Sequence, residues 1–134
     1  MKGAPVPAGE AFTPDQRRGI DKAIRAAQGS TGYAFSVYVG ASEGEPRAFA
    51  RQLHNRLAEP ANSVLVLVDP SARALEIVTG ARVRRDLDDA ETGLVALSMQ
   101  QSFAAGDLAG GITAGVYQLG EHASSATSLH TDTP

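Results

Sequence analysis

The side chains best suited to chemistry gather between residues 82 and 91 of the chain. Four carboxylates fall within six positions there, and they are Asp86, Asp88, Asp89 and Glu91. Carboxylate oxygens are ligands that a hard cation such as Ca²⁺ prefers. The segment departs from the EF-hand pattern, because Glu91 stands where that loop needs glycine and Leu97 where it needs a bidentate glutamate. One interpretation is therefore a Ca²⁺ site of another kind.

The same residues have a second interpretation, in which they shape the start of a helix. Asp88 precedes a helical pattern and Glu91 follows three positions later, which is the spacing of a capping box. The arginines that precede the segment would then pair with Asp86 and Asp89. Aspartate is also common at helix starts in general. The residue pattern alone leaves the cation site and the helix cap open.

A candidate nucleophile stands in segment 40–44 (Gly-Ala-Ser-Glu-Gly), which matches the G-x-S-x-G motif around Ser42. A catalytic triad would need an acid and then a histidine later in the chain. The histidines are poor candidates, because His54 lies in the very next helical pattern, His122 ends the last one and His130 falls near the carboxyl terminus. They also form no zinc motif. We interpret segment 40–44 as a glycine-rich turn between a strand and a helix.

A second glycine-rich segment, residues 106–111, superficially resembles a phosphate-binding loop, but no Lys-Ser or Lys-Thr follows it. It favours a break between two helices, with Asp107 as the amino-terminal cap of the second. Gly111 and Gly115 would let that helix approach a neighbour closely.

The amino-acid composition excludes several classes of function. The chain has 134 residues, 43% of them apolar and 20% charged, with no cysteine and a formal net charge of −3. The absence of cysteine excludes thiol nucleophiles, thiolate zinc sites and iron–sulfur clusters. The mild acidity argues against nucleic-acid binding. No stretch has the length and hydrophobicity of a spanning helix or of a signal-peptide core. We expect a cytoplasmic monomer that does not insert into membranes.

Ten of the twelve basic residues are arginines, and six of them fall on polar faces of two helical patterns. The first pattern carries Arg17, Arg18 and Arg25. The second carries Arg47, Arg51 and Arg56. A solvated helix surface explains them at this net charge. The alternative is a protein-interaction surface on these helices, with an unknown protein partner.

The hydrophobic pattern predicts four helices and three strands. The helices are expected over residues 14–28, where Thr13 and Gln16 form a capping box, then 46–59, 88–105 and 108–121. The strands are expected over residues 33–39, 64–68 and 74–79. The uninterrupted apolar run at 64–68 indicates a central strand buried on both faces.

A strand–helix–strand unit followed by a tight turn and a third strand predicts a small mixed sheet, with a parallel β-α-β core and an antiparallel hairpin strand. Helices are needed on both faces of such a sheet, so the expected fold class is α/β, a three-layer α/β/α sandwich. Residues 1–11 and 123–134 are expected to be loose tails around one domain at 12–122, because their composition offers little to bury.

The order of these parts resembles the TPM domain family, most of all its small actinobacterial branch of unassigned function. The resemblance spans residues 12–121 and is carried by Phe12-Thr13-Pro14, Thr31-Gly32, and segments 62–68 (Asn-Ser-Val-Leu-Val-Leu-Val), 76–80 (Glu-Ile-Val-Thr-Gly) and 106–112. Two positions depart from the family pattern. Ser63 stands where the family has glycine, and Leu108 where it has an aromatic residue.

The resemblance implies specific roles. Family members have been linked to Ca²⁺ binding by acidic loops at the carboxyl edge of the sheet, and to weak phosphatase activity. Carried over to this chain, it implies a metal site at Asp86, Asp88 and Asp89, opposite Asn62. We therefore expect a non-catalytic binding or accessory module, with Ca²⁺ as its candidate ligand. A weak metal-dependent phosphatase, in which the cation polarises phosphate and activates water, is the alternative.

Overall fold

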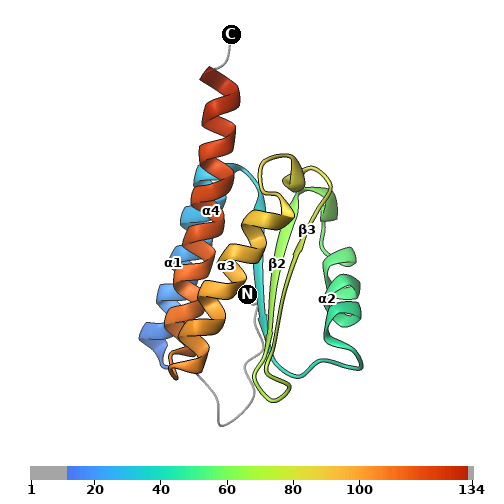
Figure 1. Ribbon diagram of the computed structural model, residues 1–134, viewed down its shortest axis with the longest axis vertical. Helices are drawn as coiled ribbons and strands as arrows, with labels where there is room; N and C mark the ends of the chain where they lie inside the picture. The colour runs from blue at the N-terminus through green and yellow to red at the C-terminus, as the bar shows by residue number, and fades with distance from the viewer. Residues whose placement is uncertain (1–11, 133–134) are drawn as a thin grey trace.

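The computed structural model describes residues 12–132, and the predicted amino-terminal tail 1–11 lies outside them. The elements follow in the order α1 (Pro14–Thr31), β1 (Ala34–Val39), α2 (Pro46–Asn55), η1 (Pro60–Asn62), β2 (Ser63–Asp69), β3 (Ala74–Thr79), η2 (Val83–Arg85), α3 (Asp89–Ala104) and α4 (Leu108–Asp132). Here η1 and η2 are single 3₁₀ turns. Figure 1 shows three layers: α1, α3 and α4 cover one face of the sheet and α2 covers the other.

The sheet has the predicted mixed topology. β2 lies in the centre, parallel to β1 and antiparallel to β3. Every residue of β2 is buried, as its continuous apolar run predicts for a strand covered on both faces. The register sets Val66 between Val37 and Ile77. The predicted α/β/α sandwich with a parallel β-α-β core and an antiparallel hairpin strand is confirmed.

The two faces of the sheet have separate hydrophobic cores. The larger core joins the odd-numbered residues of β1 and the even-numbered residues of β2 to α1, α3 and α4. The smaller core packs Ala50 of α2 on Leu65 and Leu67 of β2. Phe49 meets Tyr38 edge to face there, with ring centroids 5.7 Å apart. Successive side chains of a strand point to opposite faces of the sheet, so β1 and β2 each contribute residues to both cores.

The carboxyl-terminal ends of three helices, α1, α2 and α4, differ from the sequence-based expectation. α1 starts at the predicted Thr13–Gln16 capping box but runs past Gly29 to Thr31, and Gly32 ends it with φ +78°. The left-handed conformation that ends a helix is adopted at Gly32, so Gly29 is an ordinary helical residue. α2 is shorter than predicted and ends at Asn55.

α4 differs most, because it continues to Asp132 instead of ending near Glu121. Ala123, at the start of the predicted loose tail, is completely buried in the larger core. No glycine or proline follows until after Asp132. Extending an existing helix adds one hydrogen bond per residue fixed and is far easier than nucleating a new one. The segment 123–132 is therefore helical, and only residues 133–134 of the predicted tail lie outside the description.

Close packing of α4 on α3 confirms the prediction made for its glycines. A Cβ atom on Gly111 would collide with the Phe103 ring, and one on Gly115 would collide with the buried Met99 side chain. Asp107 caps the helix, as its Oδ1 accepts the Gly110 N–H at 2.9 Å. Gly106, in the left-handed region at φ +89°, makes the turn between the two helices.

Candidate functional site

The predicted acidic segment lies at the edge of the sheet where β1 and β2 begin. β3 is antiparallel to β2 and pairs Thr79 with Val64, so the chain that leaves β3 arrives at this edge. The resemblance places such acids at the carboxyl edge of the sheet. The structure corrects this placement, because the antiparallel hairpin delivers the segment to the amino ends of the two parallel strands. The loop carrying Asn62 is at the same edge, immediately before β2.

Asp86 and Asn62 both reach the corner formed by Gly32 and Tyr33. The Tyr33 hydroxyl donates a hydrogen bond to Asp86, and Asn62 Nδ2 donates to the Gly32 carbonyl oxygen at 3.4 Å. Burial, followed by the hydrogen bond to Asp86, raises the pKa of Tyr33 to about 12. The phenol therefore stays protonated at neutral pH and continues to donate to this carboxylate.

Asp88 is the amino-terminal cap of α3, which confirms the capping interpretation. Its Oδ1 accepts the Glu91 N–H at 2.9 Å, and Glu91 Oε1 accepts the Asp88 N–H at 3.0 Å. The other Glu91 oxygen lies 3.6 Å from His122 Nδ1. Among the residues described, no three acidic or histidine side chains converge closely enough to hold a metal ion. The arrangement of Asp86, Asp88, Asp89 and Asn62 as a cation site remains a prediction.

A polar cleft of about 480 Å³ opens beside this segment, between α2 and the end of β3. Its walls carry Arg47 and Arg51 from α2, Arg84 from η2, and Asp89 from the start of α3. We call it the arginine cleft. Arg47, Arg51 and the buried His54 are spaced four and then three residues apart, so one face of α2 presents all of them. The opposite face of α2 packs on the sheet.

Hydrogen bonds to the backbone of β3 hold two of the guanidinium groups. Arg47 Nη1 donates to the Ile77 carbonyl oxygen at 3.0 Å and lies 3.3 Å from Glu76 Oε1. Arg84 donates to the Thr79 carbonyl oxygen, in place of the predicted pairing of this arginine with an acidic neighbour. Arg51 is exposed on the cleft wall. The site therefore combines two anchored guanidinium groups with a third that is exposed to solvent.

The floor of the arginine cleft depends on the carbonyl oxygen of Ser63. It accepts the Gly80 N–H at 2.9 Å and lies 2.9 Å from His54 Nε2, so this nitrogen must be the protonated one. Gly80 is pressed against η1, where any Cβ would overlap the carbonyl oxygens of Pro60 and Ala61. Arg82 N–H also donates to the Ala61 oxygen at 2.9 Å. These contacts hold the chain that leaves β3 against η1, and Arg84 follows in the wall of the cleft.

The second candidate, Ser42, lies at the opposite edge of the sheet. Its hydroxyl and its backbone N–H both donate to Asp69 Oδ2. Burial alone raises the pKa of Asp69, but hydrogen bonds from Ser42, Ser71 and Ala72 outweigh it and lower the pKa to about 2. His54 is bonded at the start of β2 whereas Asp69 ends that strand. Ser42 is therefore part of a structural turn, as predicted, and not of a triad.

The sequence singled out Arg47, Arg51 and His54 of α2 but predicted a solvated helix face for the two arginines, and it did not single out Asn55, which also lines the arginine cleft. The spacing of Arg47, Arg51 and His54 was an available signal, because it places all three basic side chains on one face of a helix. No local signal could have placed Arg84 there, since its position depends on where the end of β3 delivers η2. None of the helices in the described part of the chain is long and apolar enough to cross a bilayer.

Several solved structures share this fold. The BA42 protein from the psychrophilic bacterium Bizionia argentinensis matches with a TM-score of 0.73 and 17% identity, over 90% of this chain and 86% of that one. The N-terminal domain of the cg2496 protein from Corynebacterium glutamicum matches with a TM-score of 0.74 and 18% identity, over 90% and 79%. The N-terminal domain of a protein from P. gingivalis matches with a TM-score of 0.69 and 20% identity, over 83% of this chain and 75% of that one. At these identities the similarity shows the fold alone.

Curated relatives come from Mycobacterium tuberculosis. Uncharacterized protein MT2543 of strain CDC 1551 and Uncharacterized protein Rv2468c of strain H37Rv are each 26% identical to this chain over 100 residues. The matched region is 75% of this chain but only 60% of either relative's length. One family matches almost the whole domain, from residue 3 to residue 120. Together with the fold, this match shows that the chain belongs to the family described as Domain of unknown function (DUF5130).

Proposed function

We propose that the chain is a non-catalytic binding domain of the TPM type, and that its ligand carries a phosphate or carboxylate group held in the arginine cleft. The observation that carries the proposal is the convergence of Arg47, Arg51 and Arg84 from two elements on one polar cleft of about 480 Å³. A guanidinium presents paired N–H donors that match the oxygens of phosphate and carboxylate. A cleft of this size suits a small molecule.

The charges of the cleft favour an anion over a cation. Glu76 lies beside Arg47 and offsets part of its charge. The hydrogen-bond acceptor of Arg84 is a neutral carbonyl, so its positive charge is not offset by that contact. Asp89 stands on the cleft wall and would favour a ligand that also carries a positive group. We therefore expect a mixed-charge or cation-bound anion to bind more tightly than the bare anion.

Binding without catalysis is supported by how the basic groups of the cleft are used. The Nε2 proton of buried His54 is committed to the Ser63 carbonyl oxygen, which holds the floor together. Arg47 and Arg84 are donors only and cannot act as general bases near neutral pH. Asp89 is then the group on the cleft wall that could accept a proton from a ligand, and the phosphatase test below addresses it.

The experiment is isothermal titration of the protein with inorganic phosphate, pyrophosphate and citrate. The double variant Arg51→Gln/Arg84→Gln should lose binding, whereas Arg56→Gln, at the C-cap of α2 and outside the cleft, should retain it. Glutamine keeps much of the side-chain length and removes only the charge. Equal affinity in the double variant and the wild type would contradict the proposal, and so would no heat from any of the three anions at millimolar concentration.

A divalent cation at Asp86, Asp88, Asp89 and Asn62 is the second candidate, with Ca²⁺ as the ion. This candidate is favoured because Asp86 and Asn62 both form hydrogen bonds at the Gly32–Tyr33 corner. Asp88 and Asp89 follow Asp86 closely in the sequence. Thermal melting should show a midpoint that rises with millimolar Ca²⁺ in the wild type and stays constant in Asp86→Asn/Asp89→Asn. A wild-type midpoint that does not respond to Ca²⁺ would remove the cation.

The metal-dependent phosphatase is tested with the same proteins. If the cation activates water beside a phosphate held by arginines, turnover of p-nitrophenyl phosphate should need Ca²⁺ and disappear in Asp86→Asn/Asp89→Asn. Turnover that persists unchanged in this variant would exclude these acids from catalysis. Anion binding with no turnover in the presence of Ca²⁺ would leave the binding domain as the function.

A further inference from the structure

β1 is an edge strand whose outer side is open. It pairs with β2 on one side, and no strand of the described residues pairs with the other. Successive residues of a strand direct their backbone N–H and C=O groups to alternate sides. Gly40 N–H donates to the Val68 carbonyl oxygen at 3.0 Å, so the even-numbered residues point toward β2. The backbone groups of Phe35, Val37 and Val39 therefore point outward.

One of these outward groups already has a partner within the chain. Gln28 Oε1, on α1, accepts the Phe35 N–H at 3.0 Å. Among the described residues, no comparable side chain reaches the N–H of Val37. Val37 is 4% exposed, and a backbone polar group with little access to water needs a hydrogen-bond partner. The open edge is thus capped at its start and left unpaired in its middle.

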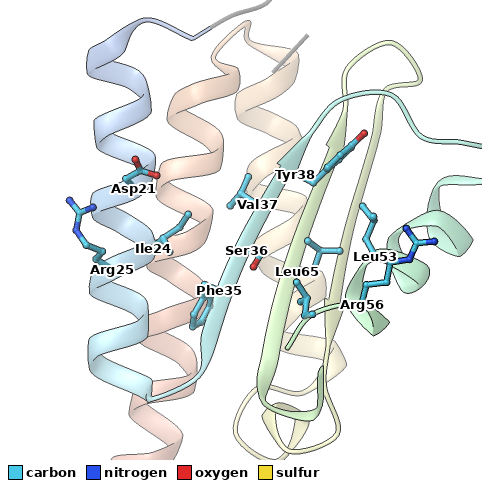
Figure 2. A pocket seen from close by; sticks show the side chains of 11 residues that line it. Asp21, Ile24, Arg25, Phe35, Ser36, Val37, Tyr38, Leu53, Arg56 and Leu65 are labelled. Carbon is cyan, nitrogen blue, oxygen red and sulfur yellow. The ribbon is translucent and has the colours of Figure 1, made fainter. Parts of the chain in front are cut away.

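A groove of about 560 Å³ runs along this open edge. α1 forms one wall, with Ile24 toward the groove, and α2 forms the other, with Leu53 (Figure 2). β1 and Leu65 of β2 form the floor. The combination of an apolar groove and a row of free backbone groups suits an extended peptide, which can pair with the strand and bury alternate side chains against the two walls.

The charged residues on the two walls indicate which end of a bound peptide would lie at which end of the groove. Arg25 on α1 and Arg56, the residue that caps the end of α2, stand on opposite walls near the level of Ser36 with their guanidinium groups turned outward from β1, whereas Asp21 lies farther along β1 near Val37 (Figure 2). The ion pairs of the described residues include neither of these arginines. Successive residues of an added strand face opposite walls. Two neighbouring acidic residues at one end of a peptide would therefore meet both guanidinium groups, and apolar or basic residues would lie near Asp21.

The recessed position of β1 argues against a second copy as the occupant. In an edge-to-edge pair of two copies, each β1 would lie between its own α1 and α2, so helices of the two copies would meet before the strands could bond. A separate extended segment has no such flanking helices and can enter.

We propose that the open edge of β1 is a docking groove for an extended segment of a partner protein, which adds to the sheet as a fourth strand. The segment has apolar residues at alternate positions and two adjacent acidic residues at the end that meets Arg25 and Arg56. This docking groove is separate from the arginine cleft, because the two surfaces have no lining residue in common. α2 contributes to both, but through different residues.

The test uses the full chain and the peptide acetyl-Glu-Glu-Val-Thr-Val-Thr-Val-amide in an NMR titration. The amide signals of Val37 and Val39 should shift downfield, and the Val37 amide should gain protection from hydrogen exchange. Two further peptides carry N-methyl groups either on the valines or on the threonines. Only one set of peptide N–H groups faces β1, so one methylated peptide should lose binding while the other retains it.

Charge dependence gives the second measurement. The variant Arg25→Glu/Arg56→Glu should weaken binding of the acidic peptide about tenfold at low salt. The control Lys22→Glu/Arg51→Glu makes the same charge change on the same two helices outside the groove and should bind like the wild type. The control also disables the arginine cleft, so failure of one proposal is distinguishable from failure of the other.

Several results would overturn the proposal. Equal binding of both N-methylated peptides would show that the backbone of β1 is not paired. A Val37 amide that is already protected without peptide would mean that the groove is filled by another segment of this chain, or by a second copy if sedimentation shows a dimer. Absence of binding at millimolar peptide would also reject it.

Discussion

Ser42 donates both its hydroxyl and its backbone N–H to the same carboxylate oxygen of Asp69, at 2.7 and 2.8 Å. The pair ties the turn that follows β1 to the last residue of β2. Asp69 is buried, and its second oxygen accepts from Ser71 Oγ at 2.8 Å and from the Ala72 N–H. One carboxylate thereby organises two turns at the edge of the sheet away from the arginine cleft.

The first prediction concerns acid stability. Asp69 has a folded-state pKa of about 2, below its usual value of 3.8, so its contribution is complete above the usual value and disappears as pH falls through about 2. Asp69→Asn should cost ~2 kcal/mol of unfolding free energy at pH 7. In urea unfolding, the gap between variant and wild type should shrink between pH 4 and pH 2. A difference in unfolding free energy between wild type and variant that stays constant with pH would contradict the lowered pKa of Asp69.

The second prediction concerns alkaline stability. The pKa of Tyr33 is raised to about 12 from 10.0, chiefly by burial and then by Asp86. The protonated phenol therefore contributes stability that is fully present below pH 10 and lost as pH rises through about 12. Tyr33→Phe should reduce stability by about 1 kcal/mol at pH 8 and show a smaller difference at pH 11. Tyr117→Phe, at an exposed position, is the control and should match the wild type at both pH values.

The third prediction concerns Gly80. A Cβ at this position would overlap backbone carbonyl oxygens of η1, which cannot move aside as a side chain can. Gly80→Ala should therefore destabilise the protein by about 3 kcal/mol and weaken anion binding, because η1 and η2 separate. Gly93, in the interior of α3, has open space around it. Gly93→Ala should instead raise stability by about 0.5–1 kcal/mol. A Gly80→Ala protein as stable as wild type would contradict the described packing.

The fourth prediction separates the two interpretations of the acidic segment. Asp88→Ala removes the cap of α3 and should cost about 1 kcal/mol in thermal unfolding. Asp89→Ala removes only a favourable charge from the first turn and should cost a few tenths of a kcal/mol, on the order of the helix-dipole term. Equal losses would contradict the capping geometry. Equal losses confined to Ca²⁺-containing buffer would instead favour the cation.

Local patterns determined much of the fold. The capping boxes at Thr13 and Asp88 were predictable because both hydrogen bonds of each box form within four residues of sequence. The central strand was predictable because a strand buried on both faces has apolar residues at every position. Helix ends that no glycine or proline marks were less predictable. α4 passes Glu121 because continuing a formed helix costs little and Ala123 is buried.

The sequence by itself therefore determined the element types, the mixed sheet, the three layers and the cap of α3, since each depends on residues that are neighbours along the chain. Only the tertiary structure decided which side chains share a site. Arg84 joins Arg47 across the arginine cleft, and Asp86 meets Tyr33, because the antiparallel β3 returns the chain to the edge where β1 and β2 begin. Such meetings depend on how the loops that follow β3 pack in three dimensions, which residue types at local spacing do not specify.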